Sequence, residues 1–144
     1  MNASKSSTVV PGSLRDPSGF LFYRHGALFR QTNHVYKEHY DLLLNSGLYE
    51  KLIKEELLIP HVEVDEAPAR ADCAYKVIKP EPISFISYPY EWCFSQLKDA
   101  ALITLRIQQH ALEFGMSLKD SSAYNIQFRN GKPVLIDTLS FEKY

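Results

Sequence analysis

The strongest constraint on the fold lies near the end of the chain, where the sequence predicts a β-hairpin. Two runs rich in β-branched and aromatic residues, 124–128 and 133–137, flank Asn130-Gly131. Asn-Gly between such runs is the strongest short-range hairpin signal, because both residues tolerate the positive φ angles of a type I′ turn. A hairpin brings its outer ends together, so we expect Asn125 and Asp137 to be neighbours.

The longest helix is expected before this hairpin, from Glu91 to Phe114. The segment contains neither Pro nor Gly, and Gly115 is the residue type that commonly ends a helix. Apolar residues recur along it near helical spacing, which predicts a buried stripe. The stripe comprises Leu97, Ala101, Leu105 and Leu112, flanked by Ala100, Ile103 and Ile107.

Short strands and helices are expected before the long helix, which makes the fold class α+β. A first hairpin is predicted with a three-residue turn at 24–26, where Gly26 supplies a positive φ angle. Residues 1–18 are polar and predict a flexible tail, so the folded module is expected over 19–144. The other elements predicted are strands at 20–23, 27–30, 61–64, 75–78 and 83–87 and helices at 35–45 and 48–57.

Composition and charge argue against several classes of function. The net charge of −1 gives no electrostatic attraction to nucleic acid or to an anionic membrane. No apolar run approaches the roughly 20 residues that span a bilayer, and the N-terminus has no apolar leader. We therefore expect a cytoplasmic protein without nucleic-acid or membrane partners. Cys73 and Cys93 provide no disulfide framework and are predicted to be buried free thiols.

Three polar residues around the C-terminal hairpin carry the strongest chemical signal. Asp120 precedes the first strand, Asn125 begins it and Asp137 ends the second strand. Carboxylate and amide oxygens suit Mg²⁺, which commonly combines one or two carboxylates with phosphate oxygens. Asp120 has the chemistry to accept a proton from an attacking hydroxyl group. The structural alternative is that all three residues cap turns and strand ends.

Residues 118–125 resemble the catalytic loop of protein kinases and aminoglycoside-phosphotransferase-like kinases, in which an Asn follows an Asp by five residues. Asp137, twelve residues after Asn125, matches the metal-binding Asp of those kinases. The resemblance implies a partial protein-kinase-like fold, with a small lobe, the long helix and the catalytic-loop hairpin. It also implies that Asp120 is the catalytic base and that Asn125 and Asp137 bind the Mg²⁺ of Mg-ATP.

The chain departs from the kinase pattern at several positions. Leu118 stands where the kinase motif usually has His, and Thr138-Leu139 replaces the usual Phe-Gly. Neither a Gly-rich phosphate loop nor a Val-Ala-Ile-Lys strand is present. Arg30 or Lys76 is therefore the candidate for the nucleotide-binding cation.

The helix partner of that cation would be an acidic residue, and Glu38 and Glu50 are the candidates. The segment Lys79-Pro80-Glu81-Pro82 falls where a kinase hinge would lie.

A second resemblance covers most of the chain. Residues 15–20, 39–49, 84–94 and 118–142 resemble the N-terminal part of bacterial proteins described as nodulation-protein-related or S-adenosylmethionine-dependent methyltransferases. This implies that a methyltransferase domain, attached or separate, is the partner. S-adenosylmethionine would bind that domain, because these residues contain no Gly-rich cofactor turn after a strand.

Three functions stay open at this point. The first is a non-catalytic or nucleotide-binding kinase-like module that serves a methyltransferase domain. The second is an active small-molecule kinase that uses Asp120, Asn125 and Asp137. The third is a protein-interaction module in which the aromatic surface at 88–90 binds a partner. The chain ends seven residues after Asp137, so we also expect uncovered apolar faces and self-association.

Overall fold

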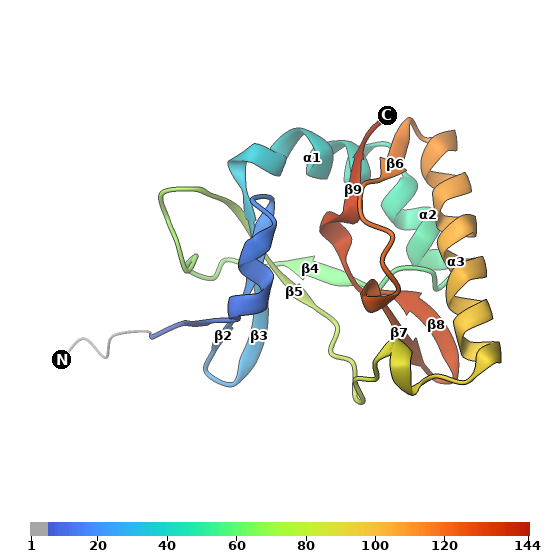
Figure 1. The fold of residues 1–144 in the computed structure, drawn as a ribbon. Coiled ribbons are helices and arrows are strands. Elements are labelled where there is room, and N and C mark those ends of the chain that lie inside the picture. The colour runs from blue at the N-terminus through green and yellow to red at the C-terminus, as the bar shows by residue number, and fades with distance from the viewer. Residues whose placement is uncertain (1–5) are drawn as a thin grey trace. The chain divides into compact units, whose positions relative to one another are not determined.

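The computed structural model describes residues 6–144 and divides into two compact units. Unit 1 contains the residues up to Glu38 together with His61–Pro82. Unit 2 contains His39–Pro60 and Ile83–Tyr144. Figure 1 shows strands and helices in the chain, which confirms the predicted α+β class.

Unit 1 is built on a five-stranded antiparallel sheet with the order β1-β2-β3-β5-β4. The predicted first hairpin is confirmed, but its turn has two residues, not three. His25 and Gly26 have φ angles of 51° and 75°, the positive pair that a type I′ turn requires. The strands are β1 (Thr8–Val9), β2 (Gly19–Arg24), β3 (Ala27–Asn33), β4 (His61–Glu63) and β5 (Ala74–Pro80).

One face of this sheet carries the apolar core of unit 1. The core comprises Phe20, Phe22, Phe29 and Val77, and the rings of Phe22 and Phe29 stack 5.6 Å apart. Two short 3-10 helices, η1 (Pro11–Arg15) and η2 (His34–Tyr36), complete the unit. Residues 8–15 therefore lie in β1 and η1, whereas residues 1–5 of the predicted tail fall outside the described residues.

Three α-helices are present among residues 6–144: α1 (Lys37–Asn45), α2 (Leu48–Lys54) and α3 (Phe94–Glu113). The α1 helix begins two residues before the boundary between the units, and α2 and α3 belong to unit 2. Gly115, with a φ angle of 75°, follows the end of α3 as predicted. The α2 helix stops earlier than predicted, because Glu56 has a φ angle of 57° that no right-handed helix accommodates.

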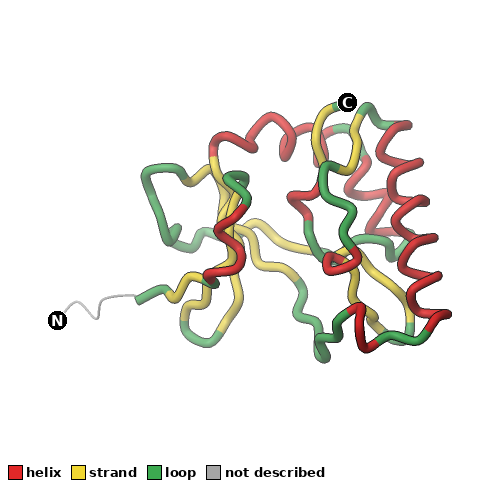
Figure 2. The backbone as a smooth tube through the Cα atoms, viewed as in Figure 1, coloured by secondary structure: helices red, strands yellow, loops and turns green. Residues whose placement is uncertain are grey.

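The predicted C-terminal hairpin is present as β7 (Ile126–Arg129) and β8 (Lys132–Leu135). Asn130 and Gly131 form its turn with φ angles of 52° and 75°. A second pair, β6 (Met116–Leu118) with β9 (Phe141–Lys143), was not predicted. Figure 2 shows both pairs and the short 3-10 helices between them. Those helices are η4 (Ala123–Asn125) and η5 (Thr138–Ser140), whereas η3 (Pro89–Glu91) precedes α3.

The predicted buried stripe of α3 is wrong. Leu97, Leu105 and Leu112 are 43%, 66% and 44% exposed. The face that packs into the core of unit 2 carries Ala100, Ile103, Ile107 and Ala111. Both rows of residues have helical spacing, so periodicity alone could not choose between them.

Two further predictions are corrected by the structure. Residues 83–87 form an irregular segment, and Ser87 bonds to a side chain of β7 instead of to a strand backbone. Cys73 and Cys93 are free thiols as expected, but Cys73 is half-buried and Cys93 is exposed. Cys93 is exposed because it precedes the first turn of α3 and does not lie on the packed face of the helix. Over residues 6–144, no helix combines the length and the apolar character that crossing a bilayer requires.

Candidate functional site

Two loops of unit 2 carry the predicted site residues. One loop joins β6 to β7 and contains Asp120, and the other joins β8 to β9 and contains Asp137. Because β6 pairs with β9 and β7 pairs with β8, the two loops run between the same two strand pairs. In Figure 1 they are the orange-red segments that connect these strands.

Backbone hydrogen bonds hold the two loops against each other at both ends. The Ile136 N–H donates to the Asn125 carbonyl oxygen over 2.9 Å, which extends the β7–β8 ladder by one pair. At the other end, the Lys119 N–H donates to the Ser140 carbonyl oxygen over 2.8 Å. Asn125 and Asp137 therefore lie on adjacent backbone segments.

Asp120 is exposed and takes part in a local turn. Its Oδ1 accepts a hydrogen bond from the Ser122 N–H at 3.0 Å. Ser122 Oγ in turn accepts one from the Tyr124 N–H at 3.2 Å and caps η4. These two bonds fix the Asp120 carboxylate in the turn that leads to Asn125. They are also the bonds that the purely structural interpretation of Asp120 predicts.

Asp137 and Asn125 are both half-buried. Asp137 Oδ1 accepts a hydrogen bond from the Leu139 N–H at 2.9 Å and caps η5. The side-chain nitrogen of Asn125 is buried and makes no hydrogen bond to any described residue. Rotating the amide by 180° would place its oxygen at that point, because amide oxygen and nitrogen exchange positions on a flip. This unsatisfied polar atom fits a ligand position, and carboxylate and amide oxygens suit Mg²⁺.

The described residues hold no group of three or more His, Cys, Asp and Glu side chains that could bind a metal ion. One carboxylate and one amide, as predicted for Asp137 and Asn125, would leave Mg²⁺ to complete its shell with phosphate oxygens and water. The ion would therefore bind together with a nucleotide and not on its own.

The two predicted phosphate-binding cations lie on one face of the sheet in unit 1. Thr32 pairs with Lys76, and Arg30 precedes Thr32 by two residues, so Arg30 and Lys76 share a face. Lys76 Nζ lies 2.8 Å from a carboxylate oxygen of Glu63 on β4. Lys76 therefore forms an ion pair with a residue of the neighbouring strand. Arg30 and Lys76 belong to a different unit from Asp120, and their action at the same site stays a prediction.

His61 on β4 is a titratable group of this region that sequence reasoning did not single out. Burial lowers the pKa of its imidazole to about 4. The nearby Glu63 carboxylate raises that pKa and Arg30 lowers it further, both by smaller amounts. His61 is therefore neutral at pH 7, because burial disfavours the protonated form.

Sequence reasoning also missed the thiol chemistry of Cys93. Its Sγ lies 3.1 Å from Ser95 Oγ, at the N-terminus of α3. This hydrogen bond, followed by that from the Gln96 backbone, lowers the pKa of the Cys93 thiol. The Cys-x-Ser spacing ahead of a long helix was the available signal, because helix N-termini stabilise thiolates.

No protein-family model matches the chain. Over 137 residues, the chain is 31% identical to the Nodulation protein NoeA of Rhizobium meliloti (strain 1021). The match covers 94% of this chain and 28% of that protein. The chain is thus homologous to part of a nodulation protein and spans just over a quarter of its length.

Proposed function

We propose that the chain is a nucleotide-binding, kinase-like module of a larger nodulation-related protein. In this proposal Mg-ATP binds at the two adjacent loops, and Asn125 and Asp137 hold the metal ion. Bound Mg²⁺ would neutralise phosphate charge, as it does in phosphoryl-transfer sites.

The hydrogen bond between Asn125 and Ile136 is the observation that carries the proposal. It brings the Asp-x4-Asn loop against the loop of Asp137, which is the juxtaposition that a kinase-like Mg-ATP site needs. One of the three points where the chain passes between the units supports the same interpretation, because it falls at Pro82, at the end of the predicted hinge. The unsatisfied side-chain nitrogen of Asn125 is a third supporting observation.

We place the module in a protein that also contains or binds a methyltransferase domain. The homologous protein is more than three times as long as the matched region, which covers 28% of it. S-adenosylmethionine would bind outside these residues. Leu118, Thr138 and the turn-capping bond of Asp120 favour nucleotide binding without phosphoryl transfer.

Thermal unfolding of the chain with ATP plus Mg²⁺, compared with ATP plus a chelator, tests the proposal. A ligand at about 100 times its dissociation constant stabilises a protein by about 2.7 kcal/mol. We expect a metal-dependent rise in the midpoint, lost in Asp137→Ala and kept in Asp72→Ala, which changes an exposed aspartate of unit 1. A folded wild-type chain whose midpoint is unchanged by Mg-ATP would refute nucleotide binding.

Measuring ATP turnover distinguishes the active-kinase alternative from nucleotide binding alone. Asp120 is exposed, so its carboxylate is accessible to an acceptor hydroxyl. Release of ADP in the presence of hydroxyl compounds, lost in Asp120→Asn while the Mg-ATP shift persists, would establish catalysis. If no ADP is released but Mg-ATP still raises the unfolding midpoint, the module binds nucleotide without catalysis.

A further inference from the structure

The segment between Lys79 and Lys98 exposes apolar and aromatic side chains and contains no basic residue. Its two charged residues are Glu81 and Glu91. Exposed apolar groups gathered in this way mark interaction sites. The large exposed side chains are Phe85, Ile86, Tyr88, Tyr90 and Phe94, at 74%, 48%, 44%, 75% and 81% exposure.

The rings of this segment are held in place before any partner binds. Tyr88 and Tyr90 stack with ring centroids 5.5 Å apart and planes 5° apart. A Glu91 carboxylate oxygen accepts a hydrogen bond from the Tyr88 N–H at 3.1 Å, which fixes a negative charge beside the stack. Below them, Trp92 donates from Nε1 to Ser87 Oγ at 2.9 Å. Such preorganisation reduces the entropy lost on binding.

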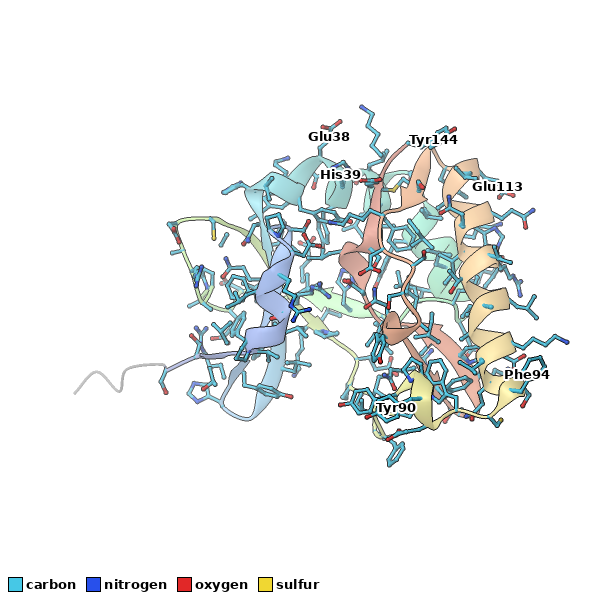
Figure 3. The ribbon with its side chains drawn as sticks, viewed as in Figure 1. Glu38, His39, Tyr90, Phe94, Glu113 and Tyr144 are labelled. Atoms are coloured by element: carbon cyan, nitrogen blue, oxygen red, sulfur yellow. The ribbon has the colours of Figure 1, made fainter. Side chains whose placement is uncertain are left out.

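Tyr124, in the loop between β6 and β7, adds a further exposed ring, at 59% exposure. The pKa of the Tyr90 hydroxyl is raised by desolvation first, and then by Glu91, Tyr88 and Tyr124. Tyr124 is thus close enough to act on Tyr90 electrostatically. Figure 3 shows Tyr90 and Phe94 projecting at the same end of α3.

We propose that this aromatic surface, defined as Phe85, Tyr88, Tyr90, Glu91 and Tyr124, binds an arginine-bearing segment of a protein partner. Aromatic ring faces are electron-rich and attract cations, and Glu91 adds a carboxylate. A planar guanidinium stacks on a tyrosine ring and also donates to a carboxylate, whereas an ammonium group does not stack. Tyrosine and arginine are both enriched at the centres of protein interfaces.

The high exposure of these side chains favours a peptide segment over a small molecule. Small ligands bind in concave sites. A cavity of about 360 Å³ in unit 2 lies elsewhere, lined by residues 55–57, α3 and β8. The aromatic surface contributes none of the residues that line it. The aromatic surface shares no residue with the proposed nucleotide site, and Tyr124 precedes Asn125 of that site.

Titration of the full chain with three synthetic peptides tests the proposal, and the single tryptophan, Trp92, is the fluorescent reporter. The peptides alternate glycine with arginine, with lysine or with citrulline, the neutral isostere of arginine. We expect saturable binding of the arginine peptide, weaker binding of the lysine peptide and none of the citrulline peptide. Isothermal titration calorimetry provides a second readout.

Variants of exposed residues keep the test independent of folding. Tyr90→Leu retains apolar bulk and should lower the affinity for the arginine peptide about five-fold, the factor that one exposed cation–π contact provides. Glu91→Gln should lower the affinity for the arginine peptide by a smaller factor and reduce the salt dependence of binding. Tyr23→Leu, an exposed tyrosine of unit 1, is the matched control and should have no effect.

Three outcomes would overturn the proposal. Equal binding of the citrulline peptide would mean that apolar contact alone drives association. Unchanged affinity of Tyr90→Leu would place binding elsewhere on the chain. Absence of saturable binding by a folded chain would mean that the surface does not recognise arginine. A metal-dependent nucleotide shift under any of these outcomes would leave the proposed function intact.

Discussion

The side chain of Gln127 pairs with the backbone of Ser87 in the manner of a neighbouring strand. Gln127 Nε2 donates to the Ser87 carbonyl oxygen and the Ser87 N–H donates to Gln127 Oε1, both at 2.9 Å. Gln127 is 3% exposed, so both bonds are shielded from water. This pair ties residues 85–91 to β7 in place of the strand that the sequence predicted at 83–87.

Replacing Gln127 with Ala should destabilise the chain by about 2 kcal/mol. The variant removes two buried hydrogen bonds and leaves the polar groups of Ser87 without these partners, at a cost of roughly 1–3 kcal/mol. Chemical denaturation followed by Trp92 fluorescence measures the change. Gln109→Ala, an exposed position of α3, is the control and should alter stability by less than about 0.5 kcal/mol. Equal stabilities of the two variants would show that the pair contributes little.

Cys93 should react with alkylating agents faster than Cys73 at neutral pH. The hydrogen bond from Ser95 lowers the pKa of the Cys93 thiol, and the thiolate is the reactive form. Rates of iodoacetamide labelling, followed by mass spectrometry across a pH series, measure the difference. In Ser95→Ala the midpoint of the Cys93 profile should move to higher pH. An unmoved Cys93 midpoint would mean that Ser95 does not stabilise the thiolate.

The stability of the chain should fall with acidification in a way that depends on His61. The pKa of His61 is about 4 in the folded chain, against an ordinary value of 6.5. The unfolded chain therefore binds more protons than the folded chain between these two pH values. His61 therefore makes its full contribution to the free energy of unfolding above pH 6.5, and this contribution declines as pH falls towards 4. Allowing for the partial solvent exposure of His61, the free energy of unfolding should fall by on the order of 2 kcal/mol.

Urea denaturation from pH 4 to pH 7 measures this decline, and the informative quantity is its slope. His61→Gln should flatten the slope even if the variant is less stable at every pH. His25→Gln, at an exposed turn position, should retain the wild-type slope. A His61→Gln slope equal to that of wild type would assign the acid sensitivity to other groups.

Local signals made part of this fold predictable. Asn130-Gly131 and Gly115 specify their own backbone conformations, and each lies where the sequence places it. The pairing of β6 with β9 carries no comparable signal, because each strand has three residues and its partner lies far along the chain. The packed face of α3 also depends on the surrounding core, which decides between two rows of equal spacing.

The site shows the same division between local and long-range information. The spacing of Asp120 and Asn125 was readable from the sequence, whereas the Asn125–Ile136 hydrogen bond was not. The bonds that Asp120 and Asp137 make to nearby N–H groups are those of the turn-capping alternative that the sequence left open. The ion pair of Lys76 with Glu63 depends on the order of strands in the sheet, which periodicity does not reveal.

The exposed leucines of α3 predict self-association of the chain. Leu97, Leu105 and Leu112 lie outside the row of α3 that packs into the core, and exposed apolar faces favour association in water. We expect sedimentation velocity to show concentration-dependent association that Leu105→Glu reduces, because a carboxylate in an apolar contact carries a desolvation cost. Leu14→Glu, at an exposed leucine of unit 1, should associate like wild type. A wild-type chain that stays monomeric at all concentrations would show that this face does not bind a second copy.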